Sequence, residues 1–335
     1  DRIGHRRVVL GSLAVMGAAS FAGSFATGGV GLLICRFLEG VGFLGVVIAA
    51  PSLIAGEVRA GDRAVGFGIW GSYHPAGGTL VLVMAPLVMA LWGWRGLWQV
   101  TGLLSLAFII LVVRARPRPP DHGAHPRAGL LANVARTVGS RGPWLPALSF
   151  GFYTMQFTAL MGWLPTYLVE NRGVSTGTAG LLTALVIAVN VPGAVLGGVL
   201  LRRGFGHGVL VGLTSMVMAV MAVLIFSPAM PDGVRYAACV GLSFFGGIIP
   251  ASLLAAAPLV APSSRQLGTT NGLIVQGSNI GNVLGPPLLA AVTTMRGRWE
   301  DSLWMFLVFA VLNIGLSFAL RREEARRKGT SLPGR

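Results

Sequence analysis

The chain has 335 residues, of which 53% are hydrophobic and only 11% are charged, and its mean hydropathy is +0.72. A soluble globular chain carries about 25% charged residues, so the composition excludes a soluble protein, and the apolar content excludes a disordered one. The net charge of +15 does not predict a nucleic-acid partner, because the arginines lie between apolar stretches rather than on a polar surface. We therefore predict an integral, all-α membrane protein.

Apolar stretches long enough to cross a bilayer, which takes about 20 residues, follow one another along most of the chain. Runs of this length satisfy their backbone groups in lipid as helices, so we predict ten transmembrane helices. They are expected at 8–27, 31–55, 66–91, 97–113, 144–169, 177–201, 208–227, 236–260, 268–293 and 303–320.

A polar stretch rich in Pro and Arg divides these helices into two groups. We predict an N-terminal bundle of four helices at 1–113, a central loop at 114–143, a C-terminal bundle of six helices at 144–320 and a basic tail at 321–335. One set of alternate loops, together with the tail, holds 20 basic residues, whereas the other set holds five. Because basic loops stay in the cytoplasm, the central loop and the C-terminus are predicted to be cytoplasmic, in a cell inner membrane.

The two halves of the chain repeat one another. A shift of 200 residues brings Gly4 onto Gly204, Gly77 onto Gly277 and Pro86 onto Pro286. In this register the first four predicted helices match the last four, and the two helices at 144–201 have no counterpart. Since the sequence also starts at Asp, we expect a six-plus-six helix bundle whose first two helices are missing.

Two motifs carry a family resemblance. Asp1-Arg2-Ile3-Gly4-His5-Arg6-Arg7 resembles the cytoplasmic loop signature of the major facilitator superfamily, and Arg36-Phe37-Leu38-Glu39-Gly40-Val41-Gly42 resembles the family's fourth-helix motif. Arg202-Arg203-Gly204-Phe205-Gly206-His207 is a degenerate second copy of the loop. GWLPTYLVENRG at 162–173 and GSYHPAGG at 71–78 resemble the branch of cyanate and nitroimidazole transporters. The resemblance implies two bundles that rock around a midplane site, latched by the loop residues Asp1, Arg2, Gly4, Arg6 and Arg7.

Arg36 and Glu39 are the only charged residues well inside a predicted helix. An ionisable residue in a membrane is a functional candidate because its insertion costs at least about 2.5 kcal/mol. Three residues apart on a helix, the two side chains can meet on one face. They either form a neutral pair that braces the bundle, or Glu39 carries a proton while Arg36 tunes it or holds an anionic substrate.

Uncharged polar residues inside the predicted helices are further candidates for a substrate and proton pathway. Trp70, Tyr73 and His74 share one helical face, and His74 is a plausible proton acceptor. The other candidates are Tyr153, Gln156, Asn190, Asn271, Gln276 and Asn279. Amides in membrane helices also serve as interhelical bonds, and this alternative stays open for each of them.

Signals for an enzyme, a metal or a cofactor are weak. Gly173-Val174-Ser175-Thr176-Gly177 matches a nucleophile motif but lies in a short loop between helices, and the one lysine, Lys328, is in the tail, so the chain has no nucleotide-binding loop. The histidines and the two cysteines have no metal-site spacing.

We therefore predict a secondary active transporter that moves a small polar or anionic solute by alternating access, coupled to protons and in contact with lipid. A membrane sensor or assembly subunit on the same scaffold is the alternative. The subunit of an ATP-driven permease is disfavoured by the two-bundle repeat.

Overall fold

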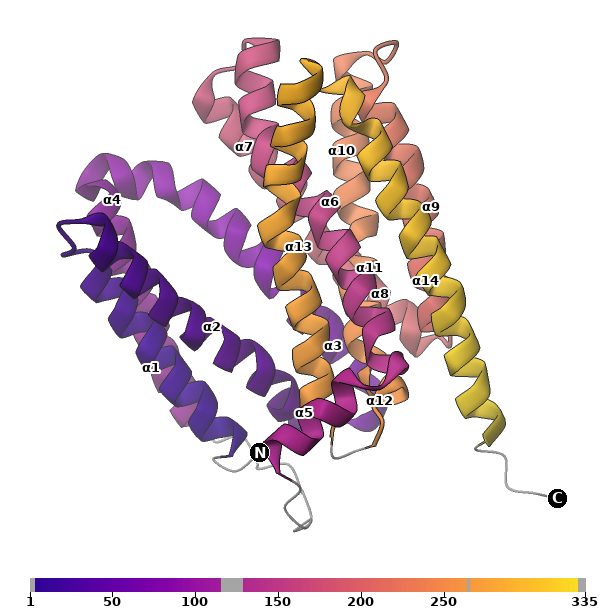
Figure 1. The fold of residues 1–335 in the computed structure, drawn as a ribbon. Coiled ribbons are helices and arrows are strands. Elements are labelled where there is room, and N and C mark those ends of the chain that lie inside the picture. Colours follow the sequence, from indigo (N-terminus) through magenta and orange to yellow (C-terminus); the bar gives the residue numbers. More distant parts are fainter. Residues whose placement is uncertain (1–3, 116–128, 264–265, 331–335) are drawn as a thin grey trace. The chain divides into compact units, whose positions relative to one another are not determined.

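The computed structural model describes residues 4–115, 129–263 and 266–330 (Figure 1). This part of the chain is entirely helical and contains no strand. The helices are α1 (His5–Gly23), α2 (Gly29–Glu57), α3 (Arg63–Gly71), α4 (Tyr73–Ala115), α5 (Leu130–Val138), α6 (Arg141–Arg172), α7 (Thr176–Ala188), α8 (Asn190–Arg202), α9 (His207–Phe226), α10 (Asp232–Gly246), α11 (Ile248–Ala255), α12 (Ala257–Val260), α13 (Leu267–Arg296) and α14 (Leu303–Thr330). Short 3-10 turns lie at Ala60–Asp62 and Glu300–Ser302.

Every segment predicted to cross the membrane falls on helix, which confirms the all-α architecture. Within the described residues, six stretches are long and apolar enough to span a bilayer. One of them, Val65–Ala115, has 51 residues. A straight helix of that length would be more than twice as long as the roughly 30 Å hydrocarbon core is thick. The count of ten spans stays a prediction.

Gly93 divides this long stretch. Its φ of +65° and ψ of −173° are non-helical, and a positive φ is a conformation that glycine adopts without strain. α4 therefore turns sharply at Gly93, and the residues after it form a second limb at 94–115. The break separates the two helices predicted at 66–91 and 97–113.

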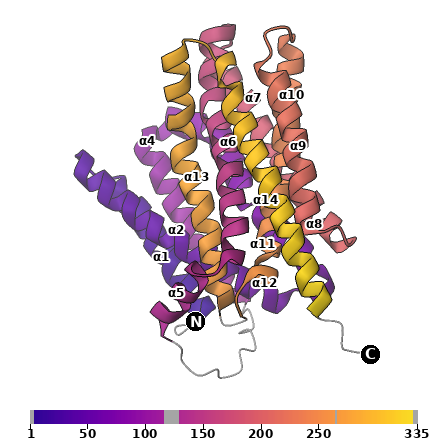
Figure 2. The ribbon, with the colours of Figure 1, turned by 45° about the vertical axis from the view of Figure 1, so that its right-hand side comes forward.

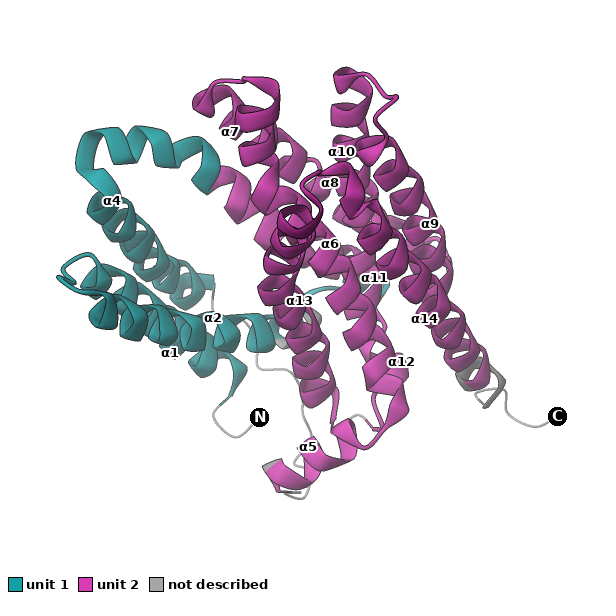
Figure 3. Cartoon of the chain, turned by 45° about the horizontal axis from the view of Figure 1, so that its top comes forward, with its two compact units in different colours: residues 1–63, 81–127 teal, residues 64–80, 128–335 magenta. Residues whose placement is uncertain are grey.

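The chain forms two compact units (Figure 3). Unit 1 contains residues 1–63 and 81–127, and unit 2 contains residues 64–80 and 128–335. Unit 2 thus includes residues 64–80, which the sequence analysis assigned to the N-terminal bundle.

The described part of unit 1 is a three-helix packing of α1, α2 and the second limb of α4. Small residues bring these helices together: a Cβ on Gly42 of α2 would lie 2.6 Å from the Ser12 carbonyl oxygen of α1. The Ser20 hydroxyl donates to the Trp98 carbonyl oxygen at 3.1 Å, which ties α1 to the second limb. Close backbone approach through small residues replaces the hydrophobic driving force that is missing in lipid.

Unit 2 is built around α6 and α13, which lie side by side along their length (Figures 1 and 2). A Cβ on Gly277 would come 2.0 Å from the Ala147 carbonyl oxygen, so only glycine fits at this point of the seam. Thr154 donates across the seam to the Ser278 carbonyl oxygen at 3.0 Å. α9, α10, α11 and α14 complete the packing, and the largest buried cluster of the described residues lies among these helices.

Residues 64–80 pack antiparallel against α7 and α8 inside unit 2. A Cβ on Gly68 would lie 2.8 Å from the Ala194 carbonyl oxygen. The Ser72 hydroxyl lies 3.5 Å from the Val191 carbonyl oxygen. Further along, the Thr79 hydroxyl lies 3.5 Å from the Ala184 carbonyl oxygen. The residue numbers along 64–80 rise as those of their partners in α8 and α7 fall, so the two segments run in opposite directions. The seam therefore uses the face of small residues at 68, 72 and 79.

The two glycines that the 200-residue shift superimposes both have a positive φ. The φ angles of Gly4 and Gly204 are +85° and +92°; Gly4 directly precedes α1, and Gly204 lies three residues before α9. Residues with a side chain rarely adopt such angles, so both positions favour glycine. The repeat of the two halves stays a prediction.

Candidate functional site

The charged pair predicted in unit 1 is formed. Nη1 of Arg36 lies 2.7 Å from Oε2 of Glu39, one helical turn away on α2. The guanidinium also stacks on the indole of Trp98 from the second limb of α4, with its Cζ 3.8 Å from the ring centroid. The Arg36 side chain is 54% exposed and that of Glu39 is 12% exposed. Arg36 thus has one carboxylate partner, one aromatic face and further N–H groups directed away from both.

The aromatic stripe of Trp70, Tyr73 and His74, from the end of α3 to the start of α4, is also formed. The rings of Trp70 and Tyr73 lie 5.1 Å apart, and Tyr73 meets His74 edge to face at 6.2 Å. At 100° per residue, positions 70, 73 and 74 lie opposite the small-residue face that packs on α7 and α8. His74 is correspondingly exposed and Trp70 half-buried. The stripe is therefore turned away from the seam inside unit 2.

Tyr153 and Asn190 form a buried network in unit 2. The Asn190 amide nitrogen donates to the Tyr153 hydroxyl at 3.0 Å and to the Ser243 carbonyl oxygen at 2.8 Å, linking α6, α8 and α10. The Tyr153 ring stacks between Phe150 and Phe157. These groups are uncharged, so they can orient a polar ligand or brace the helices but cannot hold a net charge.

Two helix junctions place Asn190 in this network. α7 and α8 meet at Val189, just before Pro192, which has no N–H to donate to the preceding turn. α10 and α11 meet at Gly247, where a Cβ would lie 2.3 Å from the Asn190 carbonyl oxygen. Val189 and Gly247 both keep right-handed helical angles, so the chain runs on through each junction. The close approach at Gly247 lets the short Asn190 side chain reach Ser243.

Gln156, one turn from Tyr153 on α6, is 1% exposed. Its nitrogen donates to the Phe152 carbonyl oxygen of its own helix at 3.3 Å, and its Oε1 has no hydrogen-bond partner among the described residues. A buried acceptor without a donor costs about 1–3 kcal/mol in soluble proteins. Gln156 is therefore a polar group that a ligand or a rearranged neighbour would stabilise.

The amides of α13 do not join this network. Gln276 is exposed, and Asn271 and Asn279 are half-buried. Their side chains make no hydrogen bond within the described ranges. The sequence placed all the polar candidates in one pathway, whereas unit 2 brings together only Tyr153 and Asn190 by a direct bond.

The loop signature is described from Gly4 onwards, and the predictions for Asp1 and Arg2 lie outside the described residues. Nη2 of Arg6 donates to the Val113 carbonyl oxygen at 3.2 Å, at the end of the second limb of α4. A cation at a helix C-terminus is stabilised by the helix dipole and the free carbonyl groups. Arg7 is exposed.

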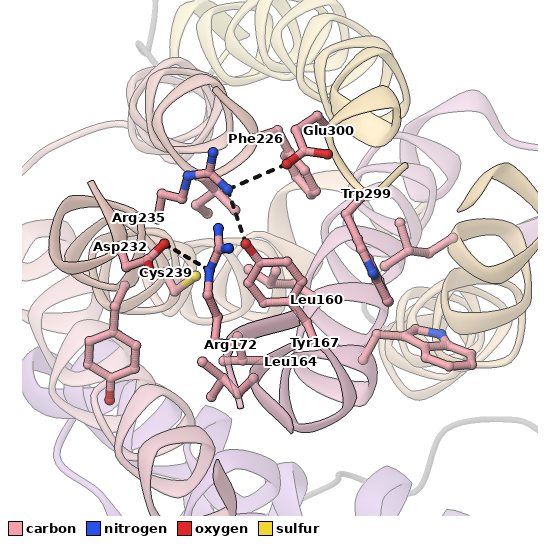
Figure 4. A pocket seen from close by; sticks show the side chains of 15 residues that line it. Leu160, Leu164, Tyr167, Arg172, Phe226, Asp232, Arg235, Cys239, Trp299 and Glu300 are labelled. Atoms are coloured by element: carbon pink, nitrogen blue, oxygen red, sulfur yellow. Dashed lines mark hydrogen bonds and ion pairs between the residues drawn. The ribbon is translucent and has the colours of Figure 1, made fainter. Parts of the chain in front are cut away.

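Sequence reasoning missed Arg235, which it counted among the loop arginines. The helix starts at Asp232 rather than at 236, so Arg235 lies in the first turn of α10 and is only 7% exposed. It borders a cavity of about 60 Å³ at the ends of α6 and α9 and the start of α10 (Figure 4). Trp98, under Arg36, was missed too, because no local pattern indicates a contact 62 residues away in the sequence.

Comparison with known families decides the identity of this architecture. The sequence model described as Major Facilitator Superfamily matches residues 1–274. The chain belongs to the major facilitator superfamily. It is thus a multi-pass membrane transporter and not an enzyme.

Transporters from other bacteria are similar over nearly the whole chain. A protein of Cupriavidus necator described as a "Probable sulfoacetate transporter" is 26% identical, over 94% of this chain and 77% of that protein. The 3-(3-hydroxy-phenyl)propionate transporter of Escherichia coli is 28% identical, over 97% of this chain and 80% of that protein.

Solved superfamily structures share the fold. The fucose:proton symporter of Escherichia coli superimposes with a TM-score of 0.76 at 14% identity, covering 94% of this chain and 84% of the symporter. The human organic anion transporter MFSD10 gives a TM-score of 0.74 at 17% identity, covering 95% of this chain and 77% of that protein. At these identities the likeness concerns the fold alone.

Proposed function

We propose that this superfamily member is a secondary active transporter of a small organic anion, coupled to protons. It works by alternating access of its two units in a cell inner membrane, with the C-terminus in the cytoplasm. The observation that carries the proposal is Arg36, a half-exposed guanidinium inside the apolar stretch Gly29–Pro51. A charge in a membrane-spanning stretch is costly to insert, so a charged residue kept there is a candidate for a functional role.

The chemistry of Arg36 favours an anion. A guanidinium offers five N–H donors and binds a carboxylate with two parallel bonds. One nitrogen faces Glu39 and the flat face lies on Trp98, so an edge of the fork stays open to a second acceptor. The relatives support the same class, since sulfoacetate, hexuronate, 3-(3-hydroxy-phenyl)propionate and gentisate all carry a carboxylate.

Glu39 supplies a route for proton coupling. A substrate carboxylate that binds Arg36 competes with Glu39 for the same cation. Two carboxylates that share one cation repel each other, which favours uptake of a proton by Glu39. Binding of the anion and of a proton are thereby linked in one step. His74, exposed on the stripe, is a second group able to take a proton.

Purified full-length protein in liposomes tests the proposal. A counterflow panel of sulfoacetate, gentisate, a hexuronate, 3-(3-hydroxy-phenyl)propionate, cyanate and a neutral nitroimidazole identifies the substrate class. We expect exchange of at least one organic carboxylate, its near-complete loss in Arg36→Gln, and normal exchange in Arg296→Gln, an exposed arginine at the end of α13. Exchange of only the neutral compound, or unchanged exchange in Arg36→Gln, contradicts the proposal.

A further inference from the structure

The cavity beside Arg235 lies wholly inside unit 2. It has a volume of about 60 Å³, and its inner wall is apolar, formed by side chains such as Leu160, Leu164, Phe226 and Cys239. The rings of Trp163 and Tyr167 from α6 pack against Trp299 at 6.1 and 5.7 Å and form one side (Figure 4).

Two arginines gather around the hydroxyl end of Tyr167. Nη1 of Arg235 donates to that hydroxyl at 3.0 Å, and Cζ of Arg172 lies 5.3 Å from the centroid of the same ring. Nε and Nη2 of Arg235 donate to the carbonyl oxygens of Met230 and Ser227. Arg172 is paired through its Nε with Asp232 at 2.8 Å, on the exposed rim. One N–H on each terminal nitrogen of Arg235 is left without a hydrogen bond to these partners.

The carboxylate that balances Arg235 is held loosely. Oε1 of Glu300 lies 3.6 Å from Nη1 of Arg235, and its Oε2 lies 3.9 Å from Nε of the exposed Arg298. Both separations are longer than a charge-assisted hydrogen bond of about 2.7–2.9 Å. Glu300 is thus shared between two cations and bonded closely to neither. It can move onto Arg298 without leaving its charge unpaired.

We propose that this cavity is a binding site for a short-chain carboxylate. The ligand's head group replaces Glu300 beside Arg235 and Tyr167, within reach of Arg172, and its alkyl chain lies against Leu160, Leu164 and Cys239. Since one water-sized position takes about 10–15 Å³, the cavity has room for roughly four to six non-hydrogen atoms. Propionate and butyrate have this size: the alkyl chain matches the apolar wall, and the carboxylate takes the position beside Arg235 that Glu300 now occupies.

This site goes beyond the proposed function, because its lining includes neither Arg36 nor Glu39 nor any residue of the Tyr153–Asn190 network. Its ligand belongs to the same chemical class as the proposed substrate. The experiment must therefore separate the two sites.

Saturation-transfer NMR on the full-length protein in detergent, with butyrate as probe and butyramide as its neutral analogue, measures occupancy. We expect transfer to butyrate and at least about tenfold weaker binding of butyramide, because the amide lacks the charge that Arg235 attracts. Glu300→Gln removes the competing carboxylate and should tighten butyrate binding roughly fivefold. Asp301→Asn, which makes the same charge change at the next residue, should leave the affinity unchanged.

Cys239 gives a second, steric test. Cys239→Leu fills the inner end of the cavity and should weaken butyrate binding at least about tenfold, whereas Cys239→Ser, of equal size, should not. The Arg36→Gln protein should bind butyrate as the wild type does, whether or not its transport is lost. Absence of transfer in the wild type, equal binding of butyramide, or unchanged affinity in Glu300→Gln overturns the proposal.

Discussion

The two units treat charge in different ways. In unit 1 the Arg36–Glu39 pair lies in the N-terminal half of the long apolar helix α2, and the guanidinium is half-exposed with one carboxylate and one indole as partners. In unit 2 the groups that bridge α6, α8 and α10 are neutral, and the buried Arg235 stands in the first turn of α10 among several acceptors. A buried charge is tolerated where acceptors surround it. Arg36, which is 54% exposed, lacks such a shell, as we expect if its charge is kept for a ligand under the proposed function.

The loop signature and its degenerate copy also differ in the contacts that their charged residues make. Arg6 of unit 1 donates to a free carbonyl oxygen at a helix end, whereas His207 of unit 2 pairs with Glu324 through both its ring Nδ1 and its backbone N–H. Gly4 and Gly204 both have a positive φ, although the side chains that follow them make different contacts. If the two units differ in this way, variants of the charged pair in unit 1 should affect transport and variants of the packing in unit 2 should affect stability.

The largest effect is expected at Glu39. Glu39→Gln removes the group proposed to take up the proton, so uptake driven by a pH gradient should fall at least about tenfold. Counterflow should persist, because exchange needs the site and the conformational change but no net proton transfer. Glu57→Gln, at the end of the same helix, is the control. Normal gradient-driven uptake in Glu39→Gln would rule out the proton role.

The same variant separates function from bracing. If the pair only holds unit 1 together, Glu39→Gln leaves Arg36 without its counter-ion, which costs about 3–5 kcal/mol in soluble examples. The melting temperature would then fall, and the double variant with Arg36→Gln would partly restore it.

The next effect concerns the framework of unit 2. Gly277→Ala places a Cβ 2.0 Å from the Ala147 carbonyl oxygen and should force α13 away from α6, destabilising the protein by about 1–3 kcal/mol. Gly272→Ala on the same helix meets no atom within 4 Å and should melt like the wild type. Thermal unfolding in detergent measures both. Equal melting temperatures of the two variants would show that α6 and α13 can move apart at this point without loss of stability.

A smaller effect is expected in the buried network. Asn190→Ala removes two hydrogen bonds, each worth about 0.6 kcal/mol between membrane helices, so a loss of roughly 1 kcal/mol should follow. Asn271→Ala, the same change at a half-buried amide without such bonds, is the matched control and should have no effect on melting. A loss of counterflow in Asn190→Ala without a change in melting would instead assign Asn190 to the substrate site.

The smallest effect is expected at the loop signature. Arg6→Gln removes a cation from the end of the second limb of α4, an interaction worth about 0.3–1 kcal/mol. The exposed Arg7 provides the control variant Arg7→Gln. A melting-temperature difference between the two should be small but reproducible. A greater loss in Arg7→Gln would indicate a role for this loop beyond the cap on the helix end.

The sequence by itself determined the helical membrane architecture and the family. These depend on composition, on the length of apolar runs and on local motifs. All three are set by residues close together in the sequence and do not depend on the rest of the fold. The contact between Arg36 and Glu39 was predictable for the same reason, since helical geometry brings residues three apart together. The stripe of Trp70, Tyr73 and His74 followed from the same periodicity.

Only the tertiary structure decided which polar residues meet across helices. The sequence treated the amides at 156, 190, 271, 276 and 279 alike, but only Asn190 reaches Tyr153, because the close approach of Gly247 to Asn190 brings α8 against α10. The stacking of Trp98 under Arg36 and the burial of Arg235 were likewise not predictable. Such contacts depend on the packing and rotation of whole helices. Those are set by small-residue seams far apart in the sequence and not by any local pattern.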